Sequence, residues 1–324
     1  MNYIVLDLEW NQSNSQKEPE CCQIPFEIVD FGAIRMSEDR KMIGEFNQLV
    51  KPQIYSQMHH ITSKIIHLHM QDLMRGKVFT QVAKEFLDFS GDDCIYCTWG
   101  TLDLFELQRN MRYYGMKPLS DGPLKYLDVQ KLYSLTFEDG KTKRNLEYAV
   151  DALKIDKDIP FHRAFSDAYY TARVMELLPE KILTRFSFDT FVLPRTKADE
   201  VHIEFDDYKK YISREFPDKR SAMQDREVSS TKCYICKKPI KKKVRWFSPN
   251  GGKHFYSIAE CPQHGFVKYK VRIKKTEFDT VYVVKTTKLV DEKTVDYYIE
   301  KRQQVQENKK KKPQSDKKEK ERRE

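Results

Sequence analysis

Hydrophobic and polar residues follow two patterns along this chain. Four apolar runs rich in Ile, Val, Phe and Tyr, at residues 2–8, 27–36, 43–50 and 93–98, predict β-strands. Elsewhere apolar residues return every three or four positions, as on one face of a helix. These helical stripes are Phe79, Val82, Ala83, Phe86 and Leu87; Leu104, Leu107, Met111 and Tyr114; Leu146, Ala149, Val150 and Leu153; and Ala164, Ala168, Ala172 and Met175. Strands followed by alternating helices and strands predict an α/β domain over residues 1–185.

The remaining residues predict a different organisation. Residues 186–230 predict a linker, whose polar and mixed part at 196–230 includes a short helix. Residues 231–290 contain many turn formers and predict a small β-rich unit. Residues 291–308 predict a helix, and the charged tail at 309–324 predicts disorder because it has almost no apolar surface to bury.

Charge is divided unevenly between these parts. The 324 residues have a net charge of +9, but residues 231–290 contain 15 basic against 3 acidic residues, a net charge of +12. Residues 1–230 have a net charge of −6. An acidic lobe joined to a basic one indicates a polyanionic partner, whereas a merely solubilising role would suit the tail better.

Cysteine usage and hydropathy point to the compartment. The seven cysteines are odd in number and unevenly spaced, which indicates reduced thiols or metal ligands and a cytoplasmic location. No run of about 18 apolar residues occurs, so neither a membrane-spanning helix nor a membrane partner is expected. The first residues lack the basic and apolar regions of a signal peptide.

Carboxylates recur at the ends of predicted elements. Asp7 and Glu9, in "NYIVLDLEW", share one face of the first strand, and Asp103, in "WGTLD", opens a helix. In "HRAFSDA", His162 precedes the last helix and Asp167 lies in its opening turns. Each has a structural alternative when taken alone: a solvent-facing pair, a helix-dipole interaction and a solvated loop histidine. Carboxylates are costly to bury without partners, and Mg²⁺ or Mn²⁺ would supply partners that prefer oxygen ligands.

The ordered set Asp7/Glu9, Asp103, His162/Asp167 resembles the DEDDh 3′→5′ exonucleases of the DnaQ-like superfamily. The stretches "DLEW", "WGTLD" and "HRAFSDA" are most similar to its KapD and Eri-type branch. Over residues 1–185 the resemblance implies a ribonuclease H-like fold, with a mixed β-sheet flanked by helices. It implies that Asp7, Glu9 and Asp167 hold the ion carrying the attacking water, and that Asp7 bridges to a second ion bound by Asp103. His162 would be the general base, since an unperturbed imidazole pKa of about 6.5 suits this role.

The resemblance also implies contacts to the 3′-terminal nucleotide. Trp10 directly follows the Asp-x-Glu pair and is expected to stack on or border the terminal base, with core packing as the alternative. Thr62, in "HHITSKIIHLH", lies where a substrate-facing loop is expected, with a solvated loop or helix as the alternative.

The basic unit contains a second pattern of metal-binding residue types. "CYIC" at 233–236 and "CPQH" at 261–264 each have two intervening residues, which is typical of zinc knuckles. The predicted ligands are Cys233, Cys236, Cys261 and His264, in a zinc-ribbon-like module over residues 231–290. The alternative is a set of reduced thiols. However, a unit this small and polar would need a bound metal or a similar stabilising cross-link to fold.

Next to this motif, "FVKYKVRIKK" alternates apolar and basic residues. Period-two alternation places Lys268, Lys270, Arg272 and Lys274 on one face of a strand. Cations combined with aromatic residues such as Trp246 and Phe247 are typical of single-strand binding, and a solvated strand face is the alternative.

Together these patterns predict a metal-dependent 3′→5′ exonuclease that releases nucleoside 5′-monophosphates from single-stranded nucleic acid. Its expected cofactors are two Mg²⁺ or Mn²⁺ ions and a structural Zn²⁺, its expected partner is the 3′ end of single-stranded RNA or DNA, and the sequence does not identify protein partners. Only the branch resemblance favours RNA over DNA. A DNA repair or proofreading exonuclease is one alternative, and a non-catalytic nucleic-acid-binding adaptor is another.

Overall fold

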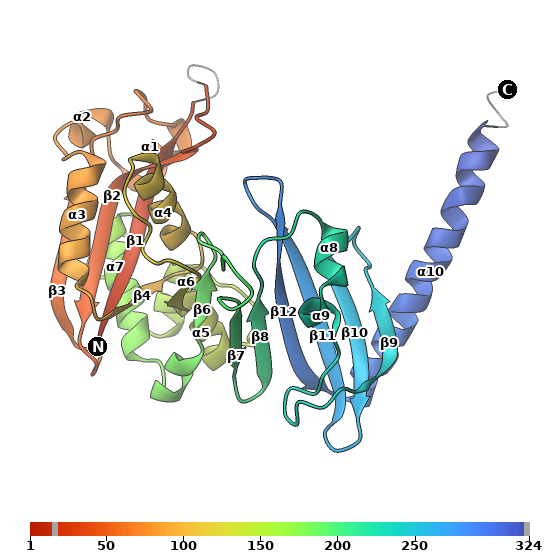
Figure 1. Ribbon diagram of the computed structural model, residues 1–324. Coiled ribbons are helices and arrows are strands. Elements are labelled where there is room, and N and C mark those ends of the chain that lie inside the picture. Colours follow the sequence, from red (N-terminus) through yellow and green to blue (C-terminus); the bar gives the residue numbers. More distant parts are fainter. Residues whose placement is uncertain (15–18, 321–324) are drawn as a thin grey trace. The chain divides into compact units, whose positions relative to one another are not determined.

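The computed structural model describes residues 1–14 and 19–320, with side chains as far as residue 308. It divides into two compact units, Met1–Val192 and Leu193–Glu324. The first contains a six-stranded mixed sheet in the order β3-β2-β1-β4-β5-β6, in which β1 is antiparallel to β2 and parallel to β4 (Figure 1). Its strands are β1 (Asn2–Gln12), β2 (Phe26–Met36), β3 (Met42–Leu49), β4 (Cys94–Thr98), β5 (Leu124–Asp128) and β6 (Ser187–Asp189).

Helices cover both faces of this sheet. They are α1 (His60–Ile66), α2 (Met70–Leu73), α3 (Phe79–Ser90), α4 (Asp103–Tyr113), α5 (Val129–Phe137), α6 (Leu146–Ala152), α7 (Ala164–Glu176) and the 3₁₀ helix η1 (Glu180–Thr184). Alternate side chains of β1 separate two cores: Tyr3 and Val5 pack with α5, α6 and α7, whereas Ile4 and Leu6 pack with α3 and α4. This is the predicted α/β class, a ribonuclease H-like mixed sheet flanked by helices.

The second unit is an antiparallel sheet in the order β7-β8-β12-β11-β10-β9. Its strands are β7 (Val201–Glu204), β8 (Tyr208–Ile212), β9 (Lys241–Phe247), β10 (His254–Cys261), β11 (Gly265–Lys275) and β12 (Val281–Val290). Two short helices, α8 (Lys219–Gln224) and α9 (Arg226–Ser229), pack through Ala222 and Val228 on one face. The long helix α10 (Glu292–Lys320) packs through Val295 on the other.

Two boundaries differ from the prediction. The stretch predicted as a linker, residues 186–230, supplies β6 to the first sheet and β7, β8, α8 and α9 to the second unit. Its apolar residues are sparse, so the periodicity is weak, but Tyr211 and Ile212 become buried through pairing with the distant strand β12. The helix predicted over residues 291–308 is described as part of α10, whose bounds reach Lys320. Residues 321–324 lie outside the described residues.

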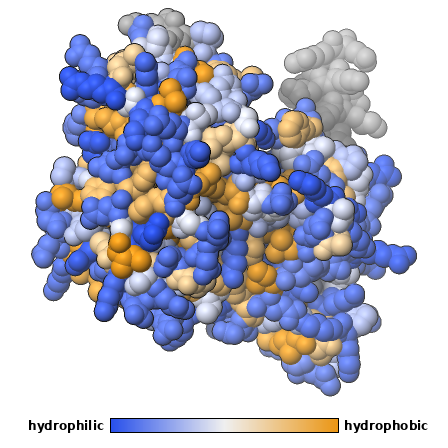
Figure 2. All heavy atoms as spheres, turned by 60° about the vertical axis from the view of Figure 1, so that its left-hand side comes forward, coloured by the Kyte–Doolittle hydropathy of each residue, from blue (hydrophilic) through white to orange (hydrophobic). Residues whose placement is uncertain are grey.

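The surface is polar where it can be seen. The view in Figure 2 is mostly hydrophilic, with apolar side chains in small groups among charged ones. Within the described ranges, no helix is both long and apolar enough to cross a membrane.

Candidate functional site

The first site residues lie near the end of the central strand β1. Asp7 and Glu9 point to the same side because side chains alternate along a strand, and Leu8 between them is 3% exposed. The pairing of β1 with β2 shifts register between Glu9 and Trp10. Such bulges redirect side chains and are common beside active sites. The strand therefore presents two carboxylates where its regular pairing ends.

Two helices bring further carboxylates to this end of β1. Asp103 is the first residue of α4, and its Oδ1 accepts the backbone N–H of Leu8 at 3.3 Å. Asp167 lies in the first turn of α7. Carboxylate oxygens of Asp7, Glu9 and Asp167 all lie within 4.8 Å of one another, and Asp103 joins them in lining a pocket of about 360 Å³. All four predicted carboxylates thus meet at one pocket.

Crowding and burial oppose ionisation of these groups. Burial, with Asp103 and Glu9 adding to it, raises the pKa of Asp7 well above its ordinary value. Burial and the nearby Asp167 raise the pKa of Glu9 to about 8. Burial likewise raises the pKa of Asp103 to about 7 and that of Asp167 to about 6. At Asp167, the hydrogen bond from the backbone N–H of His162 lowers the pKa and so partly offsets the effect of burial. Without a cation, the cluster therefore retains protons near neutral pH.

This donor set fits hard divalent cations. It offers only carboxylate oxygens, and Mg²⁺ and Mn²⁺ prefer oxygen ligands. A bound cation would replace the retained protons and remove the repulsion that raises the four pKa values. The partly buried carboxylates of β1 would thereby gain the charge partners that the sequence does not supply.

His162 lies directly before α7. Its backbone has a positive φ of 66°, and its N–H donates to Asp167 Oδ1 at 3.2 Å. The side chain is exposed and lies outside the lining of the carboxylate pocket. A left-handed non-glycine residue costs about 1 kcal/mol or more and is typical of functional sites. The contact with Asp167 keeps His162 beside the carboxylates.

A buried ion pair that the sequence analysis missed fixes the start of α7. Asp30, on β2 opposite Glu9, is fully buried and accepts Arg163 Nε at 2.7 Å and the Ala164 N–H at 3.3 Å. At Gly32, a Cβ atom would come within 2.1 Å of the Ala164 backbone, so only glycine allows this approach. The signal in the sequence was a carboxylate inside an otherwise apolar strand.

The aromatic and threonine predictions have different outcomes. Trp10 lines the pocket and also packs against Phe26, with ring centroids 5.6 Å apart, so the two roles considered for it are compatible. Thr62 lies half-buried on α1 and is not part of the pocket lining. Its contact with substrate stays a prediction.

The pocket also has a rim that the sequence did not predict. Trp99 and the exposed Lys143 line it, although 44 residues separate them in the sequence. Trp99 Nε1 and Gln130 Nε2 both donate to the backbone oxygen of Arg144, at 3.2 and 2.8 Å. These bonds hold the loop that carries Lys143 against the pocket, and they arise only from tertiary contacts.

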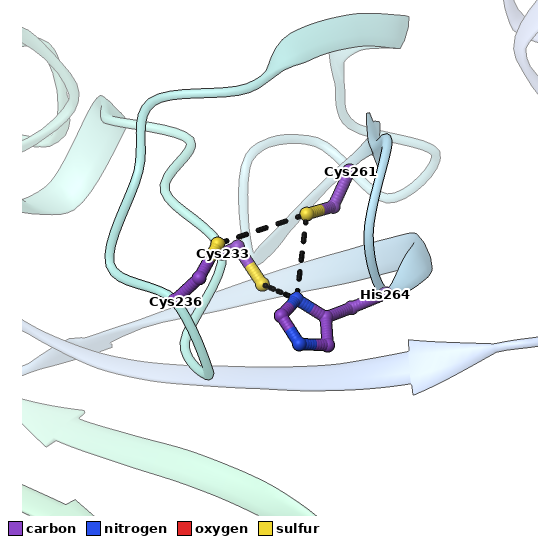
Figure 3. Close-up of side chains that lie close together, drawn as sticks. All are labelled: Cys233, Cys236, Cys261 and His264. Atoms are coloured by element: carbon purple, nitrogen blue, oxygen red, sulfur yellow. Dashed lines mark hydrogen bonds between the residues drawn. The ribbon is translucent and has the colours of Figure 1, made fainter.

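In the second unit, the four predicted zinc ligands converge (Figure 3). Cys236 Sγ lies 3.8 Å from Cys261 Sγ, and His264 Nδ1 lies 3.6 Å from Cys233 Sγ and 3.5 Å from Cys261 Sγ. A tetrahedral Zn²⁺ site has edges of about 3.8 Å between sulfurs and about 3.6 Å between sulfur and nitrogen. The spacing of the side chains therefore fits zinc.

Electrostatics at this cluster favour a thiolate. Burial opposes ionisation of Cys261, but backbone N–H groups of Gln263 and His264, together with the His264 ring, lower its pKa to about 6. A thiolate is the form that binds metal. The turns that close the cluster contain positive φ at Lys237 and Gly265.

Strand β11 has the predicted alternation. Val267, Tyr269, Val271 and Ile273 are buried on one face, so Lys268, Lys270, Arg272 and Lys274 share the other. Helix α10 partly covers this basic face, because Lys268 Nζ lies 5.2 Å from the centroid of the Tyr298 ring. Arg272 is exposed.

Comparisons with known structures give likenesses at low identity. The nuclease domain of 3′hExo, a DEDDh family member bound to rAMP, is 18% identical, with 58% of this chain and 96% of that chain covered and a TM-score of 0.46. A full-length 3′-exonuclease is 20% identical, with 54% and 80% covered and a TM-score of 0.45. Exonuclease I of E. coli with a dA16 oligonucleotide is 13% identical, with 84% and 54% covered and a TM-score of 0.47.

The family comparison covers the carboxylate pocket. A search of curated proteins finds no match. The family model RNase_T, described as exonuclease, matches residues 4–175, which include Asp7, Glu9, Asp103 and Asp167. Because this match spans more than half of the 324 residues, the chain belongs to the RNase T exonuclease family.

Proposed function

We propose that the first unit is a metal-dependent 3′→5′ exonuclease that hydrolyses single-stranded nucleic acid to nucleoside 5′-monophosphates. The observation that carries this proposal is the meeting of Asp7, Glu9, Asp103 and Asp167 at one pocket, within the part of the chain that matches the exonuclease family. A preference for RNA over DNA rests on the similarity of the three motifs to one branch of the family.

The proposed roles are those that the resemblance to the exonuclease family implies, and the shared pocket of the four carboxylates supports them. Asp7, Glu9 and Asp167 would hold one Mg²⁺ or Mn²⁺ ion, and Asp7 with Asp103 the second. When bound, the ions supply an activated water and stabilise negative charge on the phosphate and the leaving oxygen. By the resemblance, His162 would accept the proton of the attacking water, and the bond from its backbone N–H to Asp167 supports a place beside the carboxylates.

Residues at the rim would bind the terminal nucleotide. Trp10 and Trp99 offer aromatic surface for a base or sugar, and Lys143 offers a cation for a phosphate. Lys141, in the same loop, is an exposed lysine outside the pocket lining and serves as a matched control. Lys143→Ala should raise KM for a labelled oligonucleotide by about tenfold, the value of one charge-assisted contact, whereas Lys141→Ala should not. Equal effects of the two variants would exclude a specific contact.

A digestion panel tests the activity itself. Single- and double-stranded RNA and DNA, each labelled at the 5′ end, are incubated with protein and Mg²⁺ or Mn²⁺, and the products are separated by length and identified. The expected result is stepwise shortening from the 3′ end with release of mononucleotides, fastest on single-stranded RNA. Asp7→Asn should abolish it while circular dichroism stays unchanged. A folded Asp7→Asn protein with normal turnover would refute the metal assignment.

The second unit would hold the strand that the first unit cuts. This proposal is supported by the basic face of β11 and by the Cys₃His cluster, which would hold a structural Zn²⁺. A one-sided row of cations binds phosphates without reading sequence, as an exonuclease requires. The net charge of +12 over residues 231–290 supports the same role.

A further inference from the structure

A second pocket, of about 210 Å³, lies on the face of the second sheet that α8 and α9 cover. It opens between strands β8, β11 and β12 and the chain segment 227–237. Its cationic lining residues are Lys209, Lys232, Lys237 and Lys285. Tyr211, Tyr234 and Tyr269 add aromatic surface. None of these residues was predicted as a site residue, and the pocket is separate from the basic face of β11.

Lys285 is the unusual member of this group. It is only 6% exposed, although it carries a charge. Its Nζ donates to the backbone oxygens of Glu227 and Ser230, both at 2.9 Å, and lies 5.4 Å from the centroid of the Tyr269 ring. Among the described residues, no carboxylate forms an ion pair with it. Buried charges are normally paired, so this ammonium group lacks the partner that its burial calls for.

The neighbouring lysines add to the excess of positive over negative charge around the pocket. Glu227 is the one acidic residue in the described lining, against four lysines. Glu204 pairs with Lys237 and, at 3.5 Å, with Lys209, but Lys232 has no such partner among the described residues. Burial lowers the pKa of Lys285 to about 8; Glu227 opposes this effect, and Lys209 and Lys232 add to it. The pocket thus brings the exposed Lys232 next to the buried Lys285, and neither forms an ion pair with a carboxylate among the described residues.

We propose that this pocket binds a phosphate group, either as inorganic phosphate or as the phosphate of a mononucleotide. A phosphate supplies nearly two negative charges and several acceptor oxygens, which match the ammonium donors. The volume lies below the range of drug-sized ligand sites, about 300–1,000 Å³, so it suits a phosphate with at most a small attached group.

The site would also connect ligand binding to the candidate zinc cluster. Cys233 lines the pocket, and the Tyr269 hydroxyl donates to the backbone oxygen of Lys232 at 2.8 Å. A bound phosphate that contacts Lys232 would therefore steady the first cysteine pair. This inference does not depend on the exonuclease proposal, since every group it uses lies in the second unit.

Calorimetric titration of the full, zinc-loaded chain tests the pocket, with no Mg²⁺ or Mn²⁺ added. The probes are inorganic phosphate, adenosine 5′-monophosphate and adenosine, each also titrated into a Lys143→Ala protein, which lacks the phosphate contact proposed for the carboxylate pocket. Phosphate and the monophosphate should bind, and adenosine should not. Tighter binding of the monophosphate would identify a nucleotide ligand, and equal binding would identify the free ion. Either result supports the site.

Substitutions on two faces of β12 provide the matched comparison. Lys285→Met keeps the volume of the side chain but removes its charge, and Lys232→Ala removes a second cation; each should weaken binding by about tenfold or more. Lys288→Ala makes the same change of net charge on the exposed opposite face and should leave affinity unchanged. If Lys285→Met fails to fold by circular dichroism, Lys232→Ala and Lys237→Ala decide the result. Absence of phosphate binding, equal binding of adenosine, or an equal effect of Lys288→Ala would overturn the proposal.

Discussion

Replacing Glu9 with Gln should stabilise the first unit while it lacks divalent ions. Glu9 lies among like charges, and burial together with Asp167 raises its pKa from 4.5 to about 8. Below pH 4.5 the carboxyl is protonated in both the folded and the unfolded chain, so folding loses nothing. As the pH rises, the Glu9 carboxyl ionises first in the unfolded chain. This ionisation lowers the free energy of the unfolded state but not that of the folded state. The free energy of unfolding therefore falls between pH 4.5 and 8, and glutamine removes this dependence.

The size of the effect follows from the two pKa values. They imply a loss of about 3 kcal/mol at pH 7 and about 4 kcal/mol at pH 8, but less than about 1 kcal/mol at pH 5. For a unit of nearly 200 residues, each kcal/mol corresponds to roughly 2–4 °C in Tm. Glu9→Gln should thus raise the Tm of the first unit by about 6–12 °C at pH 7. Added Mn²⁺ should narrow or reverse the difference in Tm, because it binds more tightly to the protein that keeps the Glu9 carboxylate.

Differential scanning calorimetry at pH 5, 7 and 8 measures this directly, with protein dialysed free of Mg²⁺ and Mn²⁺ and its zinc content checked. Glu45→Gln, an identical change at an exposed position on β3, is the control and should leave the Tm unchanged. The reasoning is refuted if Glu9→Gln gives no stabilisation at pH 8. It is equally refuted if the gain is as large at pH 5.

Four further predictions concern the other elements of the sites. His162→Ala should lower kcat by about 10²–10⁴ while circular dichroism stays unchanged, and an unchanged kcat would exclude His162 as the base. Asp30→Ala should lower the free energy of unfolding by about 1–3 kcal/mol, measured by urea titration, because the Ala164 N–H loses its buried acceptor and Arg163 loses its partner; an unchanged free energy would contradict this. Purified protein should contain one zinc per chain by atomic absorption, and Cys233→Ser should lose it; finding no zinc in the wild type would remove the site. Arg272→Glu with Lys274→Glu should flatten the log–log salt dependence of single-strand binding by about 1.4, and an unchanged slope would show that this face does not bind the strand.

Local spacing was sufficient to predict which side chains lie together wherever neighbours in the sequence are also neighbours in space. Asp7 and Glu9 lie two residues apart on a strand, so they share a face in any sheet. The same rule separated Lys268, Lys270, Arg272 and Lys274 from the buried residues of β11. The two-residue gaps of the cysteine motifs set the turns that bring thiols together. For Asp103, His162 and Asp167, the resemblance to a family supplied the long-range association that spacing cannot.

The sequence by itself therefore determined the α/β class of the first unit, the carboxylates that meet at its pocket and the four residues of the Cys₃His cluster. Only the tertiary structure decided that Asp30 ties down α7, that Lys143 reaches the carboxylate pocket and that residues 201–212 complete the second sheet. It alone gathered Lys209, Lys232 and Lys285 around one pocket. The physical reason is that periodicity reports which side of its own element a residue faces. Which distant residues lie on that side depends on strand order and on how chain segments pack, and neither leaves a local pattern in the sequence.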